Sequence, residues 1–112
     1  MSLLIVNAAS EDTVAAPGNR LENYVVVSVT DGLGNPVTGL TAGNFKVQPI
    51  IVGPGGALVN ITNVSAAGLP GCYIIRVVPI NTETWKAGTY IFAVAVESGG
   101  NKGQNLASVL MD

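Results

Sequence analysis

The chain has 112 residues and a mass of 11.4 kDa, which is the size of a single domain spanning residues 1–112. Hydrophobic residues make up 48% of the chain but aromatic residues only 5%, so the core must consist mainly of Val, Ile, Leu and Ala, a composition typical of β-sheets. Charged residues are 11%, the net charge is −2, and neither a basic cluster nor a long apolar run is present, which argues against nucleic acid as a partner and against a membrane span.

Alternation with a period of two residues recurs between Gly, Pro and Asn, and no 3.6-residue periodicity is long enough to indicate a helix. This pattern predicts seven strands, at about residues 3–9, 22–30, 45 onwards, 57–65, 72–80, 89–97 and 104–111. The third strand is interrupted by Pro49 and by the glycines of residues 53–56, so we expect an edge strand or one that bends. Seven short strands with regular turn signals are typical of an immunoglobulin-like β-sandwich, an all-β fold.

The alternation also predicts which side chains face the core. In the second, fifth and sixth strands the inward residues are Val25, Val27, Val29, Tyr73, Ile75, Val77, Tyr90, Phe92, Val94 and Val96. The outer faces then carry Val26, Ile74, Val78, Ile91, Ala93 and Ala95. If the fifth and sixth strands are neighbours in one sheet, this apolar outer face predicts a protein partner or self-association, because monomers rarely expose large apolar patches.

The segment from Thr30 to Phe45 is rich in Gly, Asn and Asp, and two interpretations compete for it. Asp31 and Asn35, with backbone carbonyls, could supply oxygen ligands to a loose calcium site, although the spacing of an EF-hand is missing. The stronger interpretation is a structural turn, in which Asp31 and Asn35 adopt turn geometry and Pro36 presets the backbone. No dinucleotide fingerprint is present, because the third glycine and the following helix are lacking.

Trp85 is the only tryptophan, and it lies in a polar connection just before the sixth strand. An exposed ring beside Asn81 and Glu83 could stack on a sugar, which would make Trp85 a ligand-binding residue and a glycan the partner. The favoured interpretation places the ring inside the sandwich, where it plugs one end of the core.

Catalytic chemistry finds little support in the sequence. There is no histidine, which excludes Ser-His and Cys-His nucleophilic systems. The seven acids are scattered along the chain, and no cofactor motif is present. Cys72 is the single cysteine, so an intramolecular disulfide is excluded, and it is expected to face outward or to lie at a rim. We therefore predict a protein that is not an enzyme and needs no cofactor.

Two tripeptides beginning at Asn60 and Asn63 match the N-glycosylation pattern. On a regular strand, side chains three residues apart point to opposite faces, so we expect that only one of these two residues faces solvent.

The stretch "KAGTYIF", Lys86 to Phe92, resembles the tyrosine-corner segment of immunoglobulin domains, with Gly88 and Tyr90 in the matching places. Phe92 stands where those domains carry a disulfide cysteine. The phrases "GCYIIRVVP" and "AGTYIFAVAV" are similar to strands of filamin-type and bacterial immunoglobulin-like modules, and "VSVTDGLGNPVTGLTAGNFKV" is similar to the opening of bacterial adhesin repeats. The resemblance implies structural roles for Gly88, Tyr90 and Phe92, with the Tyr90 hydroxyl bonded to backbone near residues 81–86.

On this basis we predict a non-catalytic interaction or spacer module of a bacterial surface or secreted protein, and hence an extracytoplasmic or cell-surface location. The sequence contains no signal-peptide core, since the apolar run Leu3–Val6 is too short. Two alternatives are a carbohydrate-binding module that uses Trp85 and a self-assembling structural protein whose uncharged surface is buried between subunits.

Overall fold

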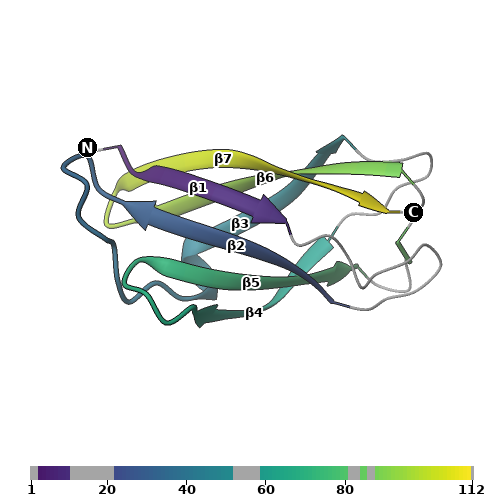
Figure 1. Ribbon diagram of the computed structural model, residues 1–112, viewed down its shortest axis with the longest axis horizontal. Coiled ribbons are helices and arrows are strands. Elements are labelled where there is room, and N and C mark those ends of the chain that lie inside the picture. Colours follow the sequence, from purple (N-terminus) through teal and green to yellow (C-terminus); the bar gives the residue numbers. More distant parts are fainter. Residues whose placement is uncertain (1–2, 11–21, 52–58, 81–83, 86–87, 112) are drawn as a thin grey trace.

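The computed structural model describes residues 3–10, 22–51, 59–80, 84–85 and 88–111. This part of the chain is almost entirely β-structure (Figure 1). Its seven strands are β1 (Ile5–Ser10), β2 (Asn23–Thr30), β3 (Phe45–Ile51), β4 (Val59–Ala66), β5 (Cys72–Pro79), β6 (Gly88–Ser98) and β7 (Asn101–Met111). A single turn of 3₁₀ helix, η1 (Ala42–Asn44), precedes β3. Within the described residues, no helix has the length and apolar character needed to cross a membrane.

The strands form two antiparallel sheets, one in the order β1-β2-β5-β4 and the other in the order β3-β6-β7. This is the strand order of a constant-type immunoglobulin sandwich. The structure therefore confirms the predicted all-β sandwich of seven strands. The third strand is both an edge strand and an irregular one, because the register with β6 shifts between Pro49 and Ile51, as the proline predicted.

The core lies between the two sheets and follows the predicted alternation. Each residue that the pattern placed inside on β2, β5 and β6 is buried. Leu4, Val6, Phe45, Val47 and Ala107 complete the cluster from the other strands, together with Trp85 from the connection before β6. β-Branched side chains dominate the core because they pack well on a pleated surface.

The condition that the fifth and sixth strands are neighbours in one sheet is not met. β5 and β6 lie in different sheets, so Ile74 and Val78 face solvent on one side of the sandwich and Ile91 and Ala93 on the other. Consecutive strands in a sandwich often cross from one sheet to the other, and alternation within a strand carries no signal for that crossing. The apolar outer residues therefore form two surfaces rather than one.

The prediction for Asn60 and Asn63 is also wrong, since both side chains are exposed. The register of β4 against β5 shifts between Ile61 and Asn63, which marks a β-bulge. The extra residue returns Asn63 to the face that Asn60 occupies, opposite the outward residue Arg76.

The first strand closes the sandwich by reaching from one sheet to the other. β1 pairs with β2, while just before it Leu3 forms a parallel bridge with Lys102 and the Leu4 N–H donates to the Lys102 carbonyl at 2.9 Å. Farther along, the Asn105 side chain donates to the Val6 carbonyl at 2.7 Å. Its amide oxygen accepts from the backbone N–H of Leu106 at 2.8 Å. Asn105 thus satisfies one backbone group on each of the two facing edges.

Candidate functional site

Asp31 organises the turn that follows β2. Its Oδ1 accepts hydrogen bonds from the backbone N–H groups of Leu33 at 2.8 Å and Asn35 at 3.0 Å, and its Oδ2 accepts one from the Asn35 side chain at 3.4 Å. The backbone closes the same turn, because the Asp31 N–H donates to the Asn35 carbonyl at 2.9 Å. Asp and Asn are favoured in turns because their short side chains can bond to the backbone in this way.

These hydrogen bonds stabilise the charged form of Asp31. The backbone N–H of Asn35, followed by that of Leu33, lowers the pKa of the carboxyl below its ordinary value. The carboxylate oxygens that a calcium ion would need already accept N–H donors. Among the described residues, no group of three Cys, Asp or Glu side chains lies close enough together to hold a metal ion. The geometry at Asp31 and Asn35 is that of the structural turn.

Trp85 lies in the core at one end of the sandwich. The side chain is 0% exposed and makes edge contacts with Tyr90 and Phe92, whose ring centroids lie 5.3 Å and 6.4 Å away. Such edge-to-face contacts are favourable between aromatic rings. With both faces of the indole covered, no surface remains on which a sugar ring could stack, so the structure places Trp85 as the core plug and not as the glycan platform.

The residues of the predicted tyrosine corner occupy the start of β6. Gly88 is its first residue and pairs with Met111, and both Tyr90 and Phe92 are fully buried. The centroids of these two rings lie 5.9 Å apart. Phe92 therefore fills core volume at the place where the resemblance put a cysteine. Residues 81–83 and 86, with which the Tyr90 hydroxyl was expected to bond, lie outside the described part of the chain.

Tyr73 has a structural role that the sequence analysis missed. It is buried in the core, with its ring 5.4 Å from that of Phe45. Its hydroxyl donates to the Val37 carbonyl at 2.7 Å and accepts from the Leu40 N–H at 3.2 Å. Both partners belong to the segment that carries the chain from one sheet to the other. Tyr73 thus holds the end of the glycine-rich stretch against the core, and its inward parity on β5 was the only signal for this.

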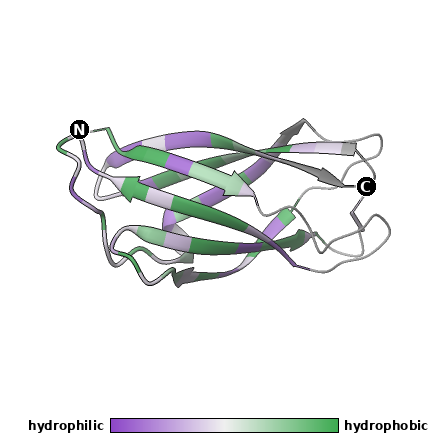
Figure 2. Cartoon of the chain, viewed as in Figure 1, coloured by the Kyte–Doolittle hydropathy of each residue, from purple (hydrophilic) through white to green (hydrophobic). Residues whose placement is uncertain are grey.

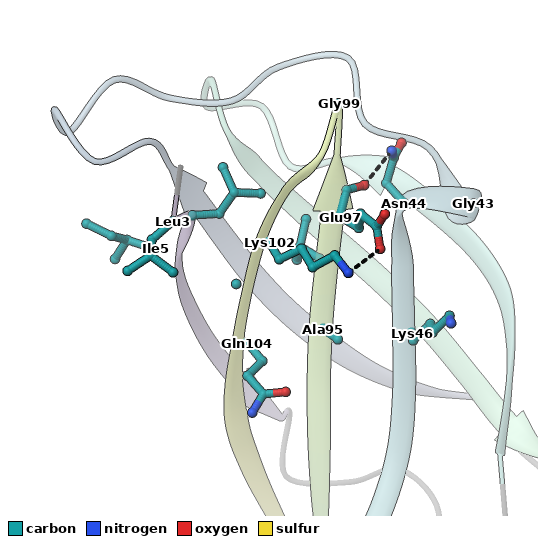
Figure 3. Close-up of a pocket in the computed structure, with 13 residues that line it drawn as sticks. Leu3, Ile5, Gly43, Asn44, Lys46, Ala95, Glu97, Gly99, Lys102 and Gln104 are labelled. Carbon is teal, nitrogen blue, oxygen red and sulfur yellow. Dashed lines mark hydrogen bonds and ion pairs between the residues drawn. The ribbon is translucent and has the colours of Figure 1, made fainter. Parts of the chain in front are cut away.

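An open groove of about 880 Å³ lies across β6 and β7 (Figure 3). Leu3 and Ile5 form one side of it and Lys46 stands on the other, while Ala95 contributes to its floor. The Lys102 ammonium lies 3.7 Å from the Glu97 carboxylate, and the Asn44 side chain donates to the Glu97 carbonyl at 2.9 Å. The groove brings together residues from β1, β3, β6 and β7, which explains why no local motif predicted it.

The exposed apolar side chains mark a second candidate surface, on the outside of the β1-β2-β5-β4 sheet. Val26 is 47% exposed and Ile5 is 49% exposed, and Ile74 and Val78 are half-buried on the same face. β2 and β5 are coloured mostly as hydrophobic in Figure 2, because apolar residues occupy outward as well as inward positions on both. Cys72 also points outward here and is half-buried, as predicted.

Comparison with known proteins assigns no family to the chain: no protein-family model matches it, and no curated protein or solved structure matches it.

Proposed function

We propose that this domain is a non-catalytic spacer and interaction module of a bacterial surface or secreted protein. The observation that carries the spacer role is the direction of the chain through the sandwich. Leu3 and Lys102 bridge in parallel, so β1 and β7 run the same way. At about 3.3 Å per residue, β7 ends roughly 30 Å beyond the point where β1 begins.

The chain consequently enters at one end of the long axis and leaves at the other (Figure 1). The principal extents are 42 × 24 × 22 Å, so each domain of this shape would add about 42 Å to an extended array. A module with both ends on the same side would fold a polypeptide back on itself. The arrangement here suits a unit that separates two parts of a longer molecule.

The interaction role is supported by the outer face of the β1-β2-β5-β4 sheet. Outward positions on a solvated sheet normally carry polar or charged side chains, whereas here Val26, Ile74 and Val78 occupy the two central strands. Burying such side chains against a partner is favourable by about 25 cal/mol per Å² of apolar area.

A head-to-tail tandem of two copies joined by a short linker tests the spacer role. Small-angle X-ray scattering should give a maximum dimension that exceeds that of the single domain by about one domain length, 42 Å along the long axis. A tandem that folds back to nearly the length of one domain would contradict the proposal.

Antibody labelling of intact cells of the source organism tests the surface location, with labelling only after lysis as the contrary result.

A further inference from the structure

The outer face of the β1-β2-β5-β4 sheet has an uncharged row at its centre. In the register of the sheet, Ala9 pairs with Val26, Val26 with Ile74, and Ile74 with Ser65, so one line of outward side chains crosses all four strands. We call the surface around this line the central-row face. Val26 lies at its middle and is 47% exposed.

Charge is nearly absent from this face. The four strands together contain one charged residue, Arg76. The Arg76 guanidinium is placed over the ring of Tyr24, 5.5 Å from its centroid, so it already has an intramolecular partner. Glu22, just before β2, accepts a hydrogen bond from the Thr62 hydroxyl at the same end of the face. The remaining rows carry apolar or small polar side chains.

The outer face on the opposite side of the sandwich carries charged side chains, which usually discourage one sheet from associating with another. The outer face of the β3-β6-β7 sheet carries Lys46, Glu97 and Lys102, all exposed. Charged side chains on a sheet discourage association with another sheet, because covering them would remove them from water. Only the central-row face lacks this protection.

Resting on the interaction role proposed above, we propose that the central-row face is a self-association surface, on which a second copy of this chain packs sheet against sheet. A partner of opposite charge is disfavoured because the face offers only one cation, and that cation is already engaged. A second copy brings an equally uncharged surface, and symmetric two-fold pairs are the commonest oligomers.

The position of Arg76 selects the orientation of the two copies. A two-fold axis along the central row places Val26 over Val26 of the second copy and directs the Arg76 end of each sheet toward the uncharged end of the other. The two Arg76 residues then lie about 14 Å apart along the strands, because each is two residues from the axis at about 3.4 Å per residue. That separation exceeds the screening length of about 8 Å in physiological salt.

The size of the central-row face indicates how tightly two copies should bind to each other. Three strands of eight residues and one of six, spaced at about 4.8 Å, give a flat area of about 500 Å² per copy, or about 1,000 Å² in total. This is close to the smallest area of specific interfaces. We therefore expect a reversible dimer with a dissociation constant in the micromolar range.

Sedimentation velocity from about 1 µM to about 500 µM measures this equilibrium. The wild-type chain should change from monomer to dimer over that range. Val26→Lys should raise the dissociation constant by about tenfold or more, because it places two ammonium groups at the axis. Leu106→Lys is the matched control: Leu106 is 54% exposed on the outer face of the other sheet, and its replacement should leave the dimer unchanged.

Circular dichroism verifies that each variant is folded. Should Val26→Lys fail to fold, Ala9→Lys changes the same row at the edge strand, where the side chain is exposed. A wild-type chain that stays monomeric at every concentration overturns the proposal. A folded Val26→Lys or Ala9→Lys variant that dimerises like the wild type also overturns the proposal. A loss of dimer that occurs only in Leu106→Lys overturns it as well. These outcomes are separate from the scattering of the tandem, so the dimer can fail while the spacer role stands.

Discussion

At the scale of single residues, Trp85 and Gly103 contribute to the packing of the two sheets in opposite ways. Trp85 supplies volume: its indole fills the core beside Tyr90 and Phe92 and is fully buried. Gly103 supplies space: it lies on β7 where Leu4 crosses over from the other sheet.

Replacing Trp85 with Ala should destabilise the domain by about 3–5 kcal/mol, because a large cavity would open in the core. Trp85→Phe should cost less, since the smaller ring retains part of the packing. Chemical denaturation monitored by circular dichroism gives both values. If Trp85→Ala left stability unchanged, or if sugars altered the Trp85 fluorescence of the native protein, the assignment of this residue to the core would be wrong.

Gly103→Ala should destabilise the domain by about 1–3 kcal/mol, because overpacking forces the backbone to shift. A Cβ atom at this position would overlap the Leu4 carbonyl oxygen and lie 2.8 Å from the carbonyl carbon. Gly32→Ala is the control, since nothing lies within 4 Å of a Cβ there. Equal unfolding free energies for the two variants would show that Leu4 does not pack tightly on β7.

At the scale of elements, the sequence predicted the strands well and their irregularities only where a proline marked them. The strand β2 begins one residue from its predicted start, and the Val25, Val27 and Val29 face is buried as expected. Such agreement arises because alternation and burial have one physical cause. The bulge in β4 was missed, because Ile61 to Asn63 contains neither Gly nor Pro to signal an extra residue.

The turn after β2 should respond to acid through Asp31. Hydrogen bonds from the backbone lower the pKa of this carboxyl in the folded state, so its contribution is present above the unfolded value of 3.8 and is lost as the pH falls through the folded pKa. Asp31→Asn keeps a side-chain oxygen in the turn but does not titrate. The wild type should therefore melt at a higher temperature than Asp31→Asn near neutral pH, and the difference should shrink as the pH falls.

Thermal melts of the two proteins between about pH 6 and about pH 2 measure this difference, and the remaining acids cancel because both proteins contain them. A difference that is constant over the whole range would show that the charge of Asp31 does not contribute. Adding millimolar calcium to chelated protein at neutral pH should leave both melting temperatures unchanged, because Asp31 Oδ1 already accepts two backbone N–H groups and Oδ2 accepts the Asn35 side-chain amide.

At the scale of the whole molecule, the sequence did not indicate which strands are neighbours in a sheet. Ile74 and Ile91 were correctly predicted to face outward, yet the two residues lie on opposite sides of the sandwich. Pairing between distant strands depends on how the two sheets stack, and no local pattern encodes that. The groove beside Lys46 and Lys102 was unpredictable for the same reason, since four separate strands contribute to it.

The two sheets share one core, and this predicts a single cooperative unfolding transition. The buried cluster runs without a break from Trp85 at one end to Val96 and Phe45 at the other, and it draws side chains from both sheets. Neither sheet has another apolar layer to cover its inner face, so neither should persist when the other unfolds.

Trp85 fluorescence reports on one end of the core, whereas far-ultraviolet circular dichroism reports on all the strands. In a urea titration kept at a concentration low enough to exclude dimer, the two signals should give the same midpoint and the same slope, as two-state unfolding requires. A fluorescence change that came clearly before the loss of β-structure would show that the Trp85 end opens separately, and that the chain is not one cooperative unit.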